Sequence, residues 1–321
     1  MPLIESNYTP PWGFRNGHVQ SIYPALWRKV PAVEWRRERI DTSDGDFLDL
    51  DCSGPGRERV AILSHGLEGN ANQPYIRGMA GALMRRGWDI VAWNCRGCSG
   101  EPNRTLRFYH SGSSDDLGTV LSHVLESGKW REVALVGFSL GGNQTLKLLG
   151  ELGESMDERV VGAVAISVTC DLAASSVKLS EWQNRIYMAR FMKTLREKVR
   201  TKERLFPGQL DLTGLDRIKT FREFDDRYTA PLHGFVDAED YWYKSGSLRF
   251  VGDIRVPTLL VNAADDPFLG GRCFPREEAE MSDWFHLEVP SHGGHVGFVS
   301  RILVRNPGGH IPGGSSEKSV T

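Results

Sequence analysis

With 321 residues, the chain is long for one compact domain and short for two, which favours a single domain carrying a sizeable insertion. Hydrophobic residues make up 40% of the chain and charged residues 25%, as in ordinary globular proteins, and the formal net charge of −2 argues against a nucleic-acid-binding protein. The sequence contains neither an apolar run long enough to span a membrane nor a recognisable signal peptide, so we expect a cytoplasmic protein without a transmembrane segment.

The first predicted elements are two strands that form an antiparallel hairpin. Residues 33–41 and 47–52 alternate in hydrophobicity around the turn signal Ser43-Asp44-Gly45. After this hairpin the pattern changes to alternating strands and helices. Short apolar runs typical of buried parallel strands lie at residues 60–63, 90–93, 133–136, 160–166, 258–261 and 285–289. The alternation predicts a mostly parallel, doubly wound α/β sheet, whose ligands bind beyond the carboxyl ends of the strands.

Helical patterns occupy the segments between these strands. Five apolar residues between Leu117 and Leu125 form one stripe of a helix, which Ser113 or Ser114 can cap and Gly128 can end. A second helix covers about 75–86 and ends at Gly87.

One long segment interrupts the alternation of strands and helices. Residues 171–253 are mainly helical in pattern and mix aromatic with basic residues, which predicts a lid or cap inserted between two strands. Its basic run 193–204 is best explained as a solvated helix face, with contact to a membrane surface or an anionic substrate as the alternative. We therefore expect a core of residues 1–170 and 254–307, an insertion over 171–253 and a frayed polar tail over 308–321.

The strongest local motif is Gly137-Phe138-Ser139-Leu140-Gly141, between a predicted strand and a predicted helix. In that context G-x-S-x-G is a nucleophile elbow, a turn so sharp that only small residues fit on either side of the serine. The motif predicts Ser139 as the nucleophile of a serine hydrolase. The alternative is a glycine-rich turn with an incidental serine.

A serine hydroxyl needs a base, and the base needs an acid that orients it. In this type of fold the order is serine, acid, histidine. Two adjacent carboxylates follow the strand 258–261, and we favour Asp266 over Asp265. Two histidines lie in the glycine-rich loop after the last strand, and we favour His295 over His292.

Acyl transfer also needs donors for the developing oxyanion. The loop His65-Gly66-Leu67 follows the strand 60–63, and we expect the backbone N–H groups of Leu67 and Leu140 to supply the donors. No sequence motif calls for a metal or an organic cofactor. The five cysteines are irregularly spaced, and the C-x-x-C formed by Cys95 and Cys98 lacks the second pair that a zinc site would need.

Taken together, these motifs resemble the YheT-like branch of the α/β-hydrolases. The resemblance rests on segments in matching order, among them N-G-H-V-Q-S-I-Y-P at 16–24 and G-G-H-V-G-F at 293–298. The other matching segments are 44–51, 65–69, 94–100, 109–112, 137–143 and 265–268.

The resemblance implies the α/β-hydrolase fold and a triad of Ser139, Asp266 and His295. It also implies hydrolysis of a small carboxylic ester, with carboxylesterase or lipase-like activity on apolar acyl groups. The alternatives are an acyltransferase that uses the same triad and a binding protein that keeps the fold without catalysis. The sequence does not indicate an oligomeric state.

Overall fold

The computed structural model describes residues 2–300, and within them nine strands form one sheet. The order across the sheet is β1-β9-β8-β7-β6-β4-β5-β3-β2. All neighbours are parallel except the pairs β2–β3 and β3–β5. The strands are β1 (Leu3–Ile4), β2 (Arg36–Asp41), β3 (Phe47–Ser53), β4 (Arg59–Ser64), β5 (Asp89–Asn94), β6 (Glu132–Phe138), β7 (Val160–Ile166), β8 (Thr258–Val261) and β9 (Phe285–Glu288).

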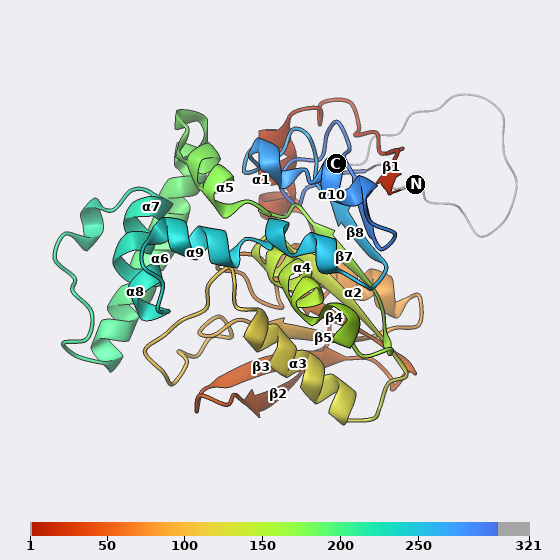
Figure 1. The fold of residues 1–321 in the computed structure, drawn as a ribbon, viewed down its shortest axis with the longest axis horizontal. Coiled ribbons are helices and arrows are strands. Elements are labelled where there is room, and N and C mark those ends of the chain that lie inside the picture. Colours follow the sequence, from red (N-terminus) through yellow and green to blue (C-terminus); the bar gives the residue numbers. More distant parts are fainter. Residues whose placement is uncertain (1, 301–321) are drawn as a thin grey trace, which may run out of the picture.

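Helices lie in front of and behind this sheet (Figure 1). They are α1 (Gly17–Trp27), α2 (Pro74–Met84), α3 (Ser114–Glu126), α4 (Leu140–Leu152), α5 (Leu172–Ser180), α6 (Arg185–Leu205), α7 (Phe221–Phe224), α8 (Ala230–Leu232), α9 (Ala238–Ser245) and α10 (Arg276–Glu280). The mostly parallel, doubly wound sheet and its antiparallel hairpin are thus confirmed. Among the helices of residues 2–300, none has both the length and the hydrophobicity required to cross a bilayer.

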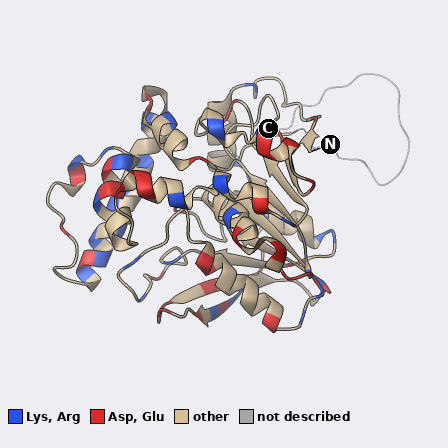
Figure 2. Ribbon diagram, in the orientation of Figure 1, with Lys and Arg blue, Asp and Glu red and all other residues tan. Residues whose placement is uncertain are grey.

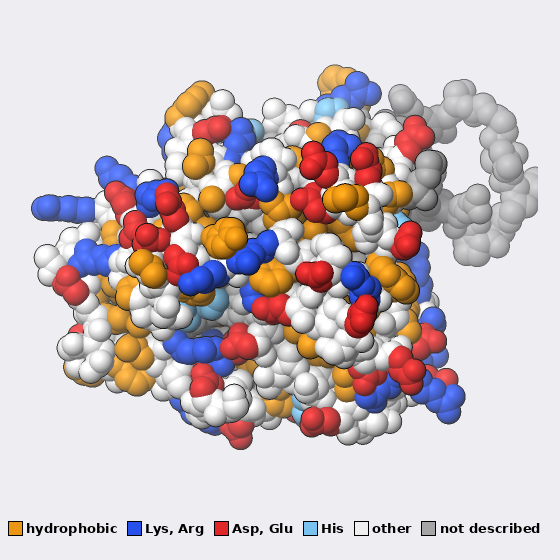
Figure 3. All heavy atoms as spheres, viewed as in Figure 1, with side chains coloured by type: hydrophobic (Ala, Val, Ile, Leu, Met, Phe, Trp, Pro, Cys, Tyr) orange, Lys and Arg blue, Asp and Glu red, His pale blue; other side chains and the backbone are white. Residues whose placement is uncertain are grey.

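The segment between β7 and β8 carries the helices α5 to α9 and a π-helical turn over Asp225–Thr229. This confirms the predicted helical insertion, which interrupts the alternation of strands and helices between β7 and β8. In Figure 2 ribbon segments coloured for basic and for acidic residues are interspersed along these helices, and Figure 3 shows apolar side chains among charged ones on the same face. The division at residues 171 and 253 stays a prediction, and the predicted tail over 308–321 lies outside the described residues.

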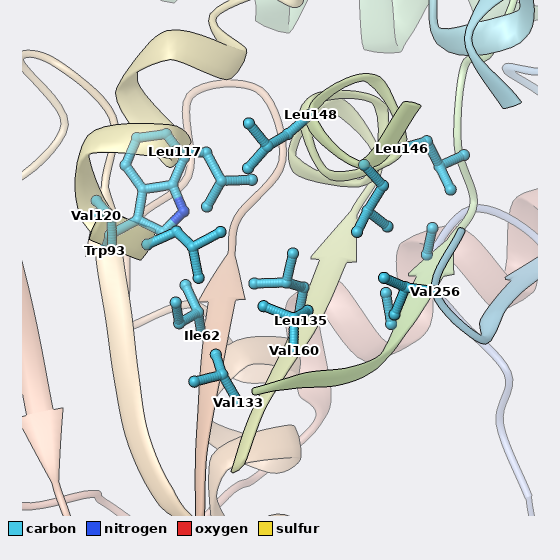
Figure 4. Packing of buried hydrophobic residues seen from close by; sticks show 14 of the residues in the cluster. Ile62, Trp93, Leu117, Val120, Val133, Leu135, Leu146, Leu148, Val160 and Val256 are labelled. Atoms are coloured by element: carbon cyan, nitrogen blue, oxygen red, sulfur yellow. The ribbon is translucent and has the colours of Figure 1, made fainter. Parts of the chain in front are cut away.

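The core lies on both faces of the sheet because successive strand residues point in opposite directions. On β4, Val60 and Ile62 pack with the helices α3 and α4, whereas Ala61 and Leu63 pack with α2. Figure 4 shows the first of these faces, with side chains of α3 and α4 packed over those of the strands. Burial on both faces makes the sheet a rigid platform for the loops at the carboxyl ends of its strands.

Two elements were not predicted from the sequence pattern. The strand β1 has two residues, which is too short to show a periodicity. The helix α1 begins after Asn16, whose side chain accepts a hydrogen bond from Val19 N–H, but it contains Pro24 and exposes several apolar side chains.

Ser113 does occupy the N-cap of α3, yet its hydroxyl accepts a hydrogen bond from the His110 N–H outside the helix.

Candidate active site

Ser139 lies at the turn between β6 and α4, where its backbone adopts the strained values φ 52° and ψ −118°. Its N–H donates to the Ile166 carbonyl of β7 over 2.8 Å, which ties the turn to the neighbouring strand. The glycines of the motif are required by contact. A Cβ on Gly137 would lie 2.5 Å from the Gly141 carbonyl oxygen, and a Cβ on Gly141 would lie 2.5 Å from the Ser64 carbonyl oxygen. The turn therefore has the geometry of a nucleophile elbow.

The imidazole of His295 lies between Ser139 and Asp266. Its Nε2 is 2.9 Å from Ser139 Oγ, and its Nδ1 is 2.9 Å from Asp266 Oδ2. These contacts fit the tautomer in which Nδ1–H donates to the carboxylate and Nε2 accepts from the hydroxyl. The structure thus brings together the three residues that the sequence favoured.

Asp266 is held in place by its own loop at the end of β8. Its side chain is buried, and its Oδ1 accepts a hydrogen bond from the Phe268 N–H over 2.9 Å. The Phe268 ring then packs on the His295 imidazole, with ring centroids 4.1 Å apart. The acid and the histidine are therefore fixed by packing as well as by their hydrogen bond.

The alternative acid and the alternative histidine pair with each other instead. The Nδ1 of His292 is 3.2 Å from Asp265 Oδ2, and Asp265 Oδ1 accepts a hydrogen bond from the Gly294 N–H over 2.9 Å. Asp265 therefore braces the loop that carries His295.

Two serines that sequence reasoning missed also support this loop. Ser21 Oγ accepts from the His295 N–H over 2.7 Å, and Ser167 Oγ accepts from the Val296 N–H over 2.9 Å. Val296 itself has a positive φ of 58°, which is strained for a β-branched residue and needs such support. Ser21 belongs to the segment 16–24 that carried the family resemblance, whereas no sequence signal marks Ser167.

The loop after β4 carries Leu67, whose N–H is one of the two expected oxyanion donors. The Gly66 N–H donates to the Tyr75 hydroxyl and the Glu68 N–H to the Tyr109 hydroxyl. Within residues 2–300 the N–H groups of Leu67 and Leu140 have no acceptor, so both are available to a ligand. A Cβ on Gly66 would lie 3.2 Å from the Ser139 Cβ, which explains the glycine beside Leu67.

His65 belongs to the scaffold of this loop. Its Nδ1 is 2.7 Å from the Gly66 carbonyl oxygen, and its Nε2 accepts from the Cys95 N–H over 3.0 Å. Burial lowers the pKa of His65 to about 4, so the imidazole stays neutral. The residue connects the ends of β4 and β5.

The insertion contacts the oxyanion loop through an ion pair. The Nζ of Lys198 on α6 lies 2.7 Å from Glu68 Oε1, and both side chains are nearly buried. The Tyr109 hydroxyl donates to the same carboxylate oxygen over 2.7 Å. Glu68 has a positive φ of 55°, and these contacts fix the backbone directly after Leu67. In the sequence, Lys198 is marked only by its place in the basic run 193–204.

Two cavities meet at Ser139. The inner cavity is lined mainly by apolar side chains of the insertion, among them Leu179, Phe191 and Phe224. The outer cavity reaches His295 and is bordered by α1 and α6. Leu67 and Phe268 line both cavities.

Two acidic side chains, Glu68 and Asp225, line the inner cavity. Asp225 accepts hydrogen bonds from the Thr229 hydroxyl and the Trp242 indole N–H, over 2.7 and 2.8 Å. Burial raises the pKa of Asp225 to about 7. Most of the remaining surface of the cavity is apolar, as an acyl chain would require.

Cys95 and Cys98 are both free thiols. Within the part of the chain that the structure describes, no group of three or more His, Cys, Asp or Glu residues is arranged to hold a metal ion.

The chain is similar to several known proteins. A family model described as alpha/beta hydrolase fold matches residues 61–301. The esterase candidate YheT of Escherichia coli (strain K12) is 35% identical over 305 residues, covering 93% of this chain and 89% of that protein. Phospholipase ABHD3 of Homo sapiens is 29% identical over 314 residues, covering 95% of this chain and 76% of that protein.

Solved structures are similar at the level of the fold. The Pyrococcus furiosus esterase Pf2001 superposes with a TM-score of 0.54 at 16% identity, covering 82% of this chain and 83% of that chain.

Proposed function

The chain belongs to the α/β-hydrolase family, in its YheT-like branch, and we propose that it is a serine hydrolase that cleaves carboxylic esters. One observation carries the proposal. The His295 imidazole lies within hydrogen-bond distance of both the Ser139 hydroxyl and the buried Asp266 carboxylate. A base so oriented can activate a serine for attack on an acyl carbon.

The proposed reaction has two acyl-transfer steps. His295 Nε2 takes the hydroxyl proton as Ser139 Oγ bonds to the ester carbonyl carbon, and the carbonyl electron pair moves onto the oxygen. When the carbonyl re-forms, the bond to the alcohol breaks and the alcohol leaves with the proton held by His295. Water then attacks the acyl-enzyme by the same route, releasing the carboxylic acid and regenerating Ser139.

Each remaining group has a defined part in this reaction. Asp266 accepts the Nδ1–H bond and stabilises the imidazolium that forms on His295. The N–H groups of Leu67 and Leu140 bind the oxyanion, a contact worth roughly a hundredfold to a thousandfold in rate for each donor.

The substrate class follows from the inner cavity. Its apolar wall suits the acyl part of an ester, and the outer cavity leaves room for the alcohol part. The names of the relatives, an esterase candidate and a phospholipase, agree with an acyl ester as the substrate. The helices of residues 171–253 would then act as the lid that shapes the acyl pocket, over the described part of the core, residues 2–170 and 254–300.

The test is hydrolysis of p-nitrophenyl esters, from acetate to laurate, by the purified protein and by Ser139→Ala. We expect activity in the parent protein, a loss of roughly a thousandfold or more in Ser139→Ala, and a maximum of kcat/KM at the chain length that fills the inner cavity. A fluorophosphonate probe should label the parent protein at Ser139.

A matched control is Ser155→Ala, which removes an exposed hydroxyl after the far end of α4. It should keep full activity and labelling. If no ester is hydrolysed and the probe labels nothing, the chain is not a serine hydrolase and the non-catalytic binding protein becomes the better explanation.

A further inference from the structure

The mouth of the outer cavity lies between two segments that are far apart in the sequence. The helix α1 contributes Pro24 and Ala25 to its wall, and α6 contributes Tyr187 and Thr194. The two helices are in contact, because the Tyr187 hydroxyl lies 3.2 Å from the Nδ1 of His18 and the two rings stack. The surface around this mouth, formed by residues 12–29 and 182–196, is called the mouth face below.

Large apolar side chains project from the mouth face into solvent. Residues 12–27 and 182–186 hold seven of the sixteen large apolar side chains that are exposed within residues 2–300. The most exposed are Trp12 (91%), Trp182 (72%), Ile186 (68%) and Trp27 (61%). Apolar side chains of this kind stand out over the end of α5 in Figure 3. Such clustering differs from the scattered exposed hydrophobic residues that any protein surface shows.

All the charged side chains of the mouth face are cations. Residues 12–29 and 182–196 contain no Asp or Glu, although the whole chain has a net charge of −2. They contain seven cations, and within residues 2–300 none of these forms an ion pair with a carboxylate: Arg15, Arg28, Lys29, Arg185, Arg190, Lys193 and Arg196. The later part of the basic run differs, because Lys198 pairs with Glu68 and Arg200 with Asp216.

We propose that the mouth face docks on an anionic lipid bilayer, so that ester lipids enter the outer cavity without crossing water. Exposed tryptophans flanked by unpaired cations are the combination that binds at a lipid headgroup boundary. The position of the mouth supports this occupant over a protein partner. A bilayer would leave the cavity open to lipid, whereas a protein bound here would cover the entrance. Lipid delivery rests on the proposed ester hydrolysis, but docking does not.

The test is co-sedimentation of the full chain with vesicles of phosphatidylcholine, alone or mixed with phosphatidylglycerol. We expect binding to be stronger by roughly tenfold or more with phosphatidylglycerol and to weaken as salt is added. The double variant Trp27→Ala/Trp182→Ala and the triple variant Lys29→Gln/Arg185→Gln/Lys193→Gln should each lose roughly tenfold or more of this binding. None of these five residues lines either cavity, so hydrolysis of a soluble p-nitrophenyl ester should stay unchanged.

Matched controls lie at the opposite end of the strands from the two cavities. Trp284 precedes β9 and Lys129 precedes β6, and both side chains are exposed at the amino ends of strands. Trp284→Ala and Lys129→Gln should bind vesicles like the parent protein. Equal binding to both kinds of vesicle, or equal losses in variants and controls, would overturn the proposal. Self-association that disappears in Trp27→Ala/Trp182→Ala, without vesicle binding, would also overturn it and assign the face to a second copy of the chain.

Binding and catalysis can be separated with Ser139→Ala. If this variant binds phosphatidylglycerol vesicles like the parent protein, docking is supported whether or not any ester is cleaved. If the parent protein hydrolyses soluble esters but ignores the vesicles, the proposed function stands and the docking proposal fails.

Discussion

Two Asp–His pairs lie beside each other in this molecule, built from adjacent aspartates and from histidines of the same short loop. The pair Asp266–His295 is nearly sealed, with side-chain exposures of 0% and 11%, and its imidazole reaches Ser139. The pair Asp265–His292 is open to solvent, with exposures of 20% and 33%, and its carboxylate binds the Gly294 N–H.

The difference shows that the type of residue does not decide the role. Both aspartates follow β8, but the Asp266 side chain meets the imidazole of His295, whereas the Asp265 side chain meets His292 and the Gly294 N–H. A buried carboxylate beside an imidazole can stabilise a transient positive charge, whereas a partly exposed one contributes little more than a local brace. We therefore assign proton transfer to the first pair and support of the loop to the second.

Substitution of the two histidines should give the largest difference in activity between the two Asp–His pairs. His295→Ala should lower kcat by roughly a thousandfold or more, because the base is removed, with little change in KM. His292→Ala should keep activity within roughly tenfold of the parent protein, since it removes only a partly exposed contact. Steady-state kinetics on a p-nitrophenyl ester measure both effects. An inactive His292→Ala beside an active His295→Ala would reverse the assignment.

Substitution of the two aspartates should give a smaller difference in kcat, again with the larger loss in the Asp266–His295 pair. Asp266→Asn leaves the side-chain volume intact but favours the wrong tautomer of His295, and we expect a loss of roughly a hundredfold to ten-thousandfold in kcat. Asp265→Asn retains an oxygen that can accept the Gly294 N–H, so its loss should stay within roughly tenfold. Thermal unfolding of both variants serves as the control, and an Asp265→Asn variant that is folded but as inactive as Asp266→Asn would refute the bracing role.

A third histidine, His65, extends the comparison to pH and should give the smallest effect. The unfolded chain protonates this residue below pH about 6.5, but burial keeps it neutral in the folded protein down to about pH 4. The stabilisation of the folded protein that comes from keeping His65 neutral is therefore fully present above pH about 6.5. As the pH falls toward 4 the free energy of unfolding decreases, by at most roughly 3 kcal/mol.

Urea unfolding at pH 7 and pH 5 measures this contribution to the free energy of unfolding. His110 and His233 are also buried, with lowered pKa values, and act in the same direction, so the contribution of His65 is isolated with His65→Gln. The variant should be less stable at pH 7 and should lose less stability on acidification. An unchanged pH dependence would contradict the neutral, structural role of His65.

The sequence was sufficient to predict the sheet and the elbow because both depend on local patterns. Apolar runs mark the strands, and the spacing of Gly137 and Gly141 around Ser139 follows from steric limits within one turn. The choice between Asp265 and Asp266 came from family resemblance, since both residues follow the same strand. It depends on the direction of a side chain, which no pattern of adjacent residues encodes.

The rest of the site is made by side chains that reach it from distant elements. Tyr75 and Tyr109 hold the oxyanion loop, and Lys198 approaches it from the insertion. Each is a single residue at no characteristic distance along the sequence from the motif that it supports, so no sequence pattern marks it. The helical character of the insertion was predictable from its composition, but the position of the inner cavity depends on how those helices pack.

The contact between α1 and the histidine loop has a consequence for how the protein is made. A Cβ on Gly294 would lie 2.3 Å from the Gly17 carbonyl oxygen, the Ser21 hydroxyl holds the His295 N–H, and the Tyr8 hydroxyl lies 2.6 Å from the Val299 carbonyl oxygen. During translation, a helix near the beginning of the chain must wait for a loop that leaves the ribosome about 270 residues later. The contact that holds the proposed base forms only after residue 295 has left the ribosome, so a shorter nascent chain carries Ser139 without His295.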